Sequence, residues 1–207
     1  TIISKTYRFL CNPVPYFRYY YNFLYRFLSS ICTTIRIKLR HTRITNKTAS
    51  LFCHDCTAGV LLHSVGLKFN TPTINLYFPD LYEYINYLAH LNKFSEVDVT
   101  EDSESCLEFP CGKLIHPDFG TVHLCFNHAH TFSEAEENWK TRITRINYSD
   151  IHVLIVMKKA DVSLLQKFNQ LPYHKAVITF PDVYPFICEY CLSENLFVSV
   201  LTYDGPR

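Results

Sequence analysis

The chain has 207 residues, of which 48% are hydrophobic and 19% charged, and this composition excludes an intrinsically disordered protein. The length suits one domain with a substantial core, and only 5 glycines argue against a turn-rich all-β protein. The net charge of +1 conceals an asymmetry, because residues 1–54 hold nine Lys or Arg and no acid, which leaves 11 basic residues against all 19 acidic ones. The basic end is therefore expected to meet an anionic partner.

The first predicted element is a helix over residues 16–40. Its apolar runs are shorter than the roughly 20 residues that cross a bilayer. A basic stripe opposite Tyr and Phe is typical of a helix lying in the plane of a membrane surface, so we expect peripheral contact with the inner face of the cell membrane. Packing on the rest of the protein, or on a second copy in an oligomer, is the alternative. The polar positions, at steps of three and four, are Arg18, Asn22, Arg26, Ser29, Thr33, Arg36 and Arg40.

Residues 40–48 read as a linker, which divides the chain into a basic helical segment, 1–45, and a domain, 46–207. Alternating strands and helices in that domain predict a layered α/β/α fold with a mostly parallel or mixed central sheet, preceded by the amphipathic helix. The first strand, helix and strand predict a βαβ unit. Strands are expected at 49–53, 71–78, 106–115, 121–128, 150–157 and 175–180, and helices at 57–67, 79–91, 131–147 (capped by Ser133) and 161–171.

A candidate nucleophile, Cys56, falls where the first strand ends and a helix begins. Ligands bind at this edge of an open α/β sheet, and a helix N-terminus favours the thiolate. His128 is the better general-base candidate, because His63 lies two helical turns from Cys56, about 10 Å away. Cys53 is expected to be buried and protonated, and Asp55 to oppose ionisation of Cys56. The alternative is that Cys56 is a small buried residue in a tight turn.

Zinc and nucleic acid are not expected as partners. Cys53 and Cys56 could form a four-thiolate site with Cys188 and Cys191, but the pairs are far apart in sequence and the first lies on an apolar strand. The aromatic residues of the basic segment follow helical period, unlike a base-stacking platform, and the acidic remainder would repel phosphate. We therefore predict no metal, no cofactor and no nucleic acid. Nine cysteines, an odd number, and no recognisable secretory signal predict a reduced, cytoplasmic compartment.

Trp139, Arg142 and Arg145 recur at three-residue steps on one predicted helix. Such a face could hold a phosphate, or a sugar ring against the indole. The alternative is a core tryptophan flanked by solvated arginines.

An ordered series of short motifs resembles the bacterial family known as domain of unknown function 1919, whose members are often labelled exopolysaccharide or capsule biosynthesis proteins. The stretches that carry the resemblance are "HDCTAGVLLHSVGLKFNTPTINLYF", "FPCGKL", "HAHTFSEAEENWKTRITRIN" and "FNQLPY". Three positions depart from the family pattern: Asp55 stands where Asn is usual, Ala58 replaces a glycine, and "KKAD" follows the central strand. The residues carried over are Cys56, Gly59, His63, Gly66, Pro72, Asn75, Gly112, His128, Trp139, Arg142, Arg145 and Asn147.

The resemblance implies a role in surface polysaccharide biosynthesis. We expect a transferase acting on an activated or lipid-linked sugar, with a sugar or nucleotide-sugar as substrate. The alternative is a non-catalytic binding or scaffold protein of the same machinery. The predicted catalytic residues are Cys56, His128 and His63, and the predicted substrate contacts are Asp55, Gly59, Asn75, Trp139, Arg142 and Arg145.

Overall fold

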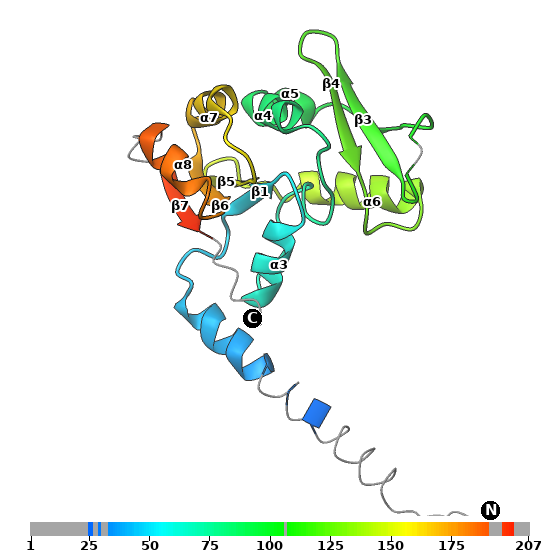
Figure 1. Cartoon of the computed structure of the whole chain (residues 1–207). Helices are drawn as coiled ribbons and strands as arrows, with labels where there is room; N and C mark the ends of the chain where they lie inside the picture. Colours follow the sequence, from blue (N-terminus) through cyan, green and yellow to red (C-terminus); the bar gives the residue numbers. More distant parts are fainter. Residues whose placement is uncertain (1–24, 27–28, 30–32, 106, 191–195, 201–207) are drawn as a thin grey trace, which may run out of the picture. The chain divides into compact units, whose positions relative to one another are not determined.

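The structure is a computed structural model that describes residues 25–26, 29, 33–105, 107–190 and 196–200 (Figure 1). The chain divides into two units, which are considered separately. One unit comprises residues up to 45 together with 64–66, and the other comprises 46–63 and the residues from 67 onward.

The first unit is helical over residues 33–43, so the helix extends into the predicted linker. Arg36, Arg40, Ile35 and Leu39 are all exposed on it. Much of the predicted 16–40 helix lies outside the described residues, and its membrane contact stays a prediction. Among the helices that the structure describes, none combines the length and apolar character that a membrane span needs.

The second unit is built on a parallel four-stranded sheet in the order β1-β5-β6-β7. These strands are β1 (Ser50–Cys53), β5 (Ile151–Met157), β6 (His174–Thr179) and β7 (Leu196–Val200). A smaller antiparallel sheet contains β2 (Thr100–Glu101), β3 (Cys111–His116) and β4 (Gly120–Cys125). The hairpin between β3 and β4 turns at Gly120, whose φ of 78° suits glycine.

Helices cover both faces of the parallel sheet, which confirms the predicted α/β fold with a mostly parallel sheet. Phe52, Val153 and Ile155 belong to the larger core, with α4 and α7, whereas Cys53 and Leu154 pack on α3. Successive side chains of a strand point to opposite faces, so β1 and β5 are apolar on both sides. Figure 1 shows α4 and α7 on one side of the sheet and α3 on the other. The helices are α3 (Thr57–Ser64), α4 (Leu81–Ala89), α5 (Leu91–Phe94), α6 (Phe132–Ile143), α7 (Val162–Asn169) and α8 (Tyr184–Tyr190).

Residues 71–78 do not form the predicted strand, so the predicted βαβ unit over 49–78 is wrong. The segment turns instead, and it makes one isolated bridge, between Tyr77 and Cys125. Thr71 donates its hydroxyl to the Leu51 carbonyl at 2.7 Å, so this segment reaches the edge strand β1 with a side chain. Pro72 has no N–H to donate and Asn75 has a φ of 64°, and both features oppose a regular ladder. The partner of β1 is β5, a hundred residues later in the chain.

Helix α6 lies within the predicted range 131–147, but its N-cap is two residues before the predicted Ser133. Its N-cap is Thr131, whose hydroxyl accepts a hydrogen bond from the Glu134 amide at 3.2 Å, and Ser133 lies within the helix. Glu134 in turn accepts from the His130 amide at 3.0 Å. Both Thr131 and Ser133 suit a cap by residue type, and each has a Glu three residues later, so the sequence alone did not decide between them.

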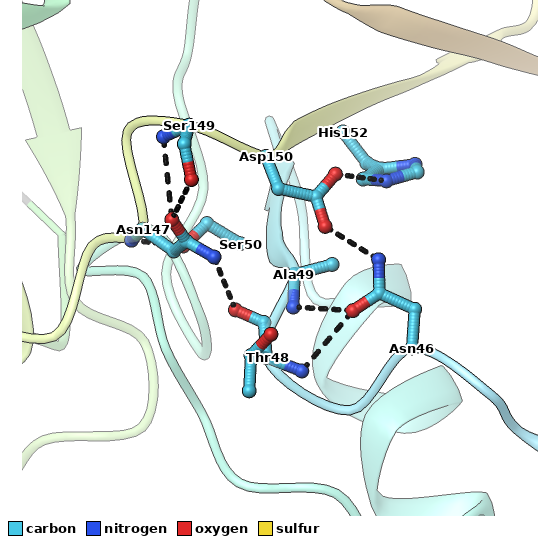
Figure 2. Close-up of polar contacts among 8 residues, drawn as sticks. All are labelled: Asn46, Thr48, Ala49, Ser50, Asn147, Ser149, Asp150 and His152. Carbon is cyan, nitrogen blue, oxygen red and sulfur yellow. Dashed lines mark hydrogen bonds and ion pairs between the residues drawn. The ribbon is translucent and has the colours of Figure 1, made fainter.

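Asn147, in the loop before β5, forms hydrogen bonds with residues at the start of β1 (Figure 2). Its amide N–H donates to the hydroxyl of Ser50 at 2.7 Å, and its side chain donates to the Thr48 carbonyl at 3.3 Å. Ser50 is fully buried, whereas Ser149, which donates to Asn147 Oδ1 at 2.7 Å, is exposed. The Asn147 that the family resemblance carries over is therefore a structural residue at this corner.

Replacing Ser50 with Ala should lower the free energy of unfolding by about 1–2 kcal/mol, because the Asn147 amide loses its acceptor in a buried setting. Ser149→Ala is the matched control and should change it by less than about 0.5 kcal/mol. Urea denaturation of both variants measures the difference. Equal losses would mean that the buried hydrogen bond does not hold this corner.

Candidate functional site

The site centres on Cys56, in the turn that joins β1 to α3. Its Sγ lies 3.3 Å from Nε2 of His128, which follows β4 by three residues. Cys56 is partly exposed and His128 is exposed, so both can be reached from solvent. The carboxyl ends of parallel strands are where open α/β sheets bind ligands, and the contact lies at that edge. A thiol and an imidazole at this separation are placed for proton transfer between them.

Asn127 is a third member of this group that the sequence did not single out. Its amide Nδ2 lies 3.5 Å from the Cys56 Sγ. It adjoins His128 on the loop after β4. The predicted strand ran through residue 128, so the sequence did not indicate that both residues belong to a loop. An amide beside a nucleophile can donate a hydrogen bond to an oxyanion that forms on the attacked carbon.

Asp55 holds the turn in place through hydrogen bonds to the residues on either side of Cys56, and its predicted opposition to ionisation of Cys56 stays a prediction. Its Oδ1 accepts hydrogen bonds from the Thr57 amide at 2.9 Å and from the Cys53 thiol at 3.0 Å. Partial burial acts to raise the pKa of the Asp55 carboxyl, but hydrogen bonds from Cys53 and Thr57 outweigh it and hold that pKa below its usual value. The ionised carboxylate thus caps the start of α3.

Cys53 is the inert partner that the sequence predicts. Its side chain is fully buried, and burial, together with the adjacent Asp55 carboxylate, raises the pKa of its thiol well above the usual value. Cys53, His54 and Asp55 lie close enough to hold a metal ion. Such an ion would have to displace both the Cys53 thiol hydrogen bond and the cap of α3, so this group fits a structural turn better.

Gly59 and Asn75 are packed against each other behind Cys56. A Cβ added to Gly59 would lie 2.6 Å from Oδ1 of Asn75 and 3.3 Å from the side chain of Ile74. Asn75 itself has a left-handed backbone, which asparagine tolerates better than most residues. The first turn of α3 therefore needs glycine at position 59, because any side chain there would collide with the side chain of Asn75.

Two cavities meet at the Cys56–His128 contact. His128 and Asn75 line one of about 220 Å³, and Cys56 and Asn127 line a more open one of about 650 Å³ that Lys158 also borders. Cys56, His128 and Asn75 thus gather in one region without lining one pocket. The polar groups around the smaller cavity are Asn75, His128, Glu134, Asn138, the indole of Trp139 and Arg142.

Trp139, Arg142 and Arg145 were predicted to share one helix face, but they lie in three different environments. Trp139 is a buried core residue whose Nε1 lacks a hydrogen-bond partner, and its ring borders the smaller cavity. Arg142 lines the same cavity while donating to the Ile74 carbonyl at 2.6 Å. Arg145 lies beyond the end of α6 and donates to the Phe69 carbonyl at 3.4 Å, so it fastens the 69–74 segment. Burial lowers the pKa of Arg142, and Arg145 adds to this effect.

His63 and the distant cysteine pair do not join this group in the described structure. His63 is exposed in the last turn of α3 and is absent from the lining of both cavities. Cys188 is exposed on α8, and Cys191 lies outside the described residues. The four-thiolate arrangement therefore stays untested, and the Cys53 thiol that it requires is occupied by Asp55.

The fold and site define a class: an α/β protein with a parallel sheet that presents a cysteine–histidine contact at the carboxyl edge. Within that class, the chain belongs to the family described as domain of unknown function (DUF1919), whose model matches residues 28–195. It is also 25% identical over 144 residues to an uncharacterized protein of Haemophilus influenzae. That alignment covers 69% of this chain and 66% of the relative, so the chain spans just under two thirds of the relative's length.

In native protein near neutral pH, iodoacetamide should alkylate Cys56 faster than Cys53. Cys53 is buried and protonated, whereas Cys56 is accessible and contacts an imidazole that can accept its proton. His128→Gln should slow alkylation of Cys56 several-fold and leave exposed Cys188, the internal control, unchanged. Peptide mass spectrometry gives the three rates. Equal protection of Cys53 and Cys56 would assign the whole turn to the core.

Proposed function

We propose that the protein is a thiol-dependent transferase of surface polysaccharide biosynthesis that moves an acyl group to or from a sugar. The observation that carries the proposal is the 3.3 Å contact between Sγ of Cys56 and Nε2 of His128. A thiolate is a strong nucleophile toward acyl carbon, and an adjacent imidazole supplies it at neutral pH. The sugar and the pathway rest on the cavity lining and on the family resemblance.

The chemistry assigns one role to each neighbouring side chain. Nε2 of His128 takes the proton of Cys56, and the thiolate attacks the carbonyl carbon of an activated acyl ester. The attack produces a tetrahedral intermediate whose oxygen carries a negative charge, the oxyanion. The amide Nδ2 of Asn127, 3.5 Å from the sulfur, is placed to donate to that oxyanion. The leaving alcohol takes the proton from His128, and a thioester remains on Cys56. A sugar hydroxyl then loses its proton to His128 and attacks the thioester. The carbon–sulfur bond breaks, the acylated sugar leaves, and the Cys56 thiolate takes the proton back from His128.

The smaller cavity suits a single sugar residue. Its volume of about 220 Å³ is below the roughly 300–1,000 Å³ of pockets for drug-sized ligands. Glu134 can accept hydrogen bonds, Arg142 can donate them, and Asn138 can do both, which matches the mixed donors and acceptors of sugar hydroxyls.

The chemical step is tested with p-nitrophenyl acetate, a generic activated ester. The native protein should release nitrophenol in a burst of about one equivalent and gain one acetyl group on Cys56, as acyl-enzyme chemistry requires. Cys56→Ser and His128→Gln should lose the burst, and Cys188→Ser, the matched cysteine control, should keep it. Acetylation in the native protein that spares Cys56, or a burst that survives Cys56→Ser, would contradict the proposal.

The pathway is tested by analysing the surface polysaccharide of a strain that carries Cys56→Ala at the native locus. We expect its acylation or amount to fall to the level of a deletion strain, while Cys188→Ser matches wild type. A deletion strain with altered polysaccharide that Cys56→Ala fully restores would favour the non-catalytic scaffold. Unchanged polysaccharide in the deletion strain would reject the pathway.

A further inference from the structure

A second cluster of chemically reactive side chains lies at the amino-terminal edge of the parallel sheet. Asp150 directly precedes β5, His152 is the second residue of that strand, and His174 is the first residue of β6. His152 and His174 are Cα partners in the parallel register, so both imidazoles project from the same face of the sheet. Their rings stack with centroids 4.8 Å apart and planes 27° from parallel.

We propose that Asp150, His152 and His174 form a binding site for a divalent transition-metal ion of the zinc type. One ligand atom from each residue lies within 4.8 Å of the others, and Nε2 of His152 is 2.9 Å from Oδ1 of Asp150. Tetrahedral zinc with bonds of about 2.0–2.1 Å places its ligand atoms roughly 3.3 Å apart. The 2.9 Å between Nε2 of His152 and Oδ1 of Asp150 is slightly shorter than this spacing, and the His174 ligand atom lies within 4.8 Å of both.

Neighbouring residues orient the Asp150 carboxylate (Figure 2). Asn46 donates its amide to Oδ2 of Asp150, on the side away from His152, which leaves Oδ1 for a metal ion. Oδ1 of Asn46 accepts the backbone amides of Thr48 at 3.2 Å and Ala49 at 3.1 Å, which fixes the orientation of the Asn46 side chain. Such outer contacts orient metal ligands in proteins.

The ligand set selects the class of metal. Two imidazoles with one carboxylate favour zinc and neighbouring first-row ions over Mg²⁺ or Ca²⁺, which prefer oxygen. His152 and His174 border an open cavity of about 520 Å³, so water can complete the coordination. Lys175 follows His174 in β6, so its side chain points to the opposite face of the sheet, where its Nζ donates to the Leu171 carbonyl at 2.7 Å.

This metal site is independent of the proposed transferase site. Cys56 lies beyond the carboxyl end of β1, whereas the histidines lie at the opposite, amino-terminal edge of the sheet. At about 3.3 Å per residue, the seven residues of β5 separate the two edges by roughly 20 Å. A bound ion would tie the entrances of β5 and β6 together and, through Asn46, the approach to β1. Its function would thus be to stabilise the sheet.

The test is titration of the full chain with Co²⁺, a spectroscopic substitute for zinc, under reducing conditions. We expect visible bands of nitrogen- and oxygen-ligated cobalt, without the near-ultraviolet thiolate charge-transfer band that cysteine ligands would give. His174→Asn should weaken binding by more than about tenfold, and Asn46→Ala, which removes the contact to Asp150 together with those to the Thr48 and Ala49 amides, by about tenfold. His63→Asn, an exposed histidine on α3, is the matched control and should bind as the native protein does.

Thermal melting supplies a second readout. Zinc should raise the melting temperature of the native protein and of His63→Asn but not that of His174→Asn, because an ion that binds only the folded state stabilises it. His174 is exposed, so the metal-free melting temperature of its variant should match that of the native protein. Native affinity in His174→Asn, equal loss in His63→Asn, or a thiolate charge-transfer band as the main signal would overturn the assignment.

Discussion

The turn from β1 into α3 depends on one carboxylate. Asp55 accepts one hydrogen bond from the thiol of buried Cys53 and another from the Thr57 amide. A single side chain therefore contacts both the last residue of β1 and the first residue of α3. Cys56 lies between these anchors and is thereby held at the rim of the sheet. An asparagine, which the family pattern usually has here, could accept the same two hydrogen bonds through its Oδ1. The carboxylate adds the attraction of a negative charge for a helix N-terminus.

The rest of the site is assembled from two other parts of the chain. The hairpin of β3 and β4 delivers Asn127 and His128 to Cys56, and the irregular 69–75 segment delivers Asn75 across Gly59. That segment is held by side chains rather than by a strand ladder, through Thr71 to β1 and through Arg142 from α6. Arg142 and Ile74, which this last hydrogen bond joins, both line the smaller cavity.

The two edges of the parallel sheet carry different chemistry. The carboxyl edge has a thiol, an imidazole and a polar cavity, which suit covalent catalysis. The amino edge has two stacked imidazoles beside a carboxylate that Asn46 orients, which suit a divalent ion. Strand β5 connects them, since it begins beside Asp150 and its last residue, Met157, precedes the Lys158 that borders the Cys56 cavity.

The sequence by itself determined the fold class, most of the elements, and the difference between Cys53 and Cys56. Those properties follow from local patterns: apolar runs for β1 and β5, helical spacing for α4 and α6, and the position of Cys56 just after an apolar strand. It failed at 71–78, where an alternating pattern suggests a strand but Pro72 and Asn75 stop the ladder. The sequence already favoured His128 over His63, but only the tertiary structure decided that His128 contacts Cys56, that Asn127 joins them, and that His152 lies beside His174. These contacts join residues between 20 and about 70 positions apart, and no local spacing encodes which strand ends converge on one edge of a sheet.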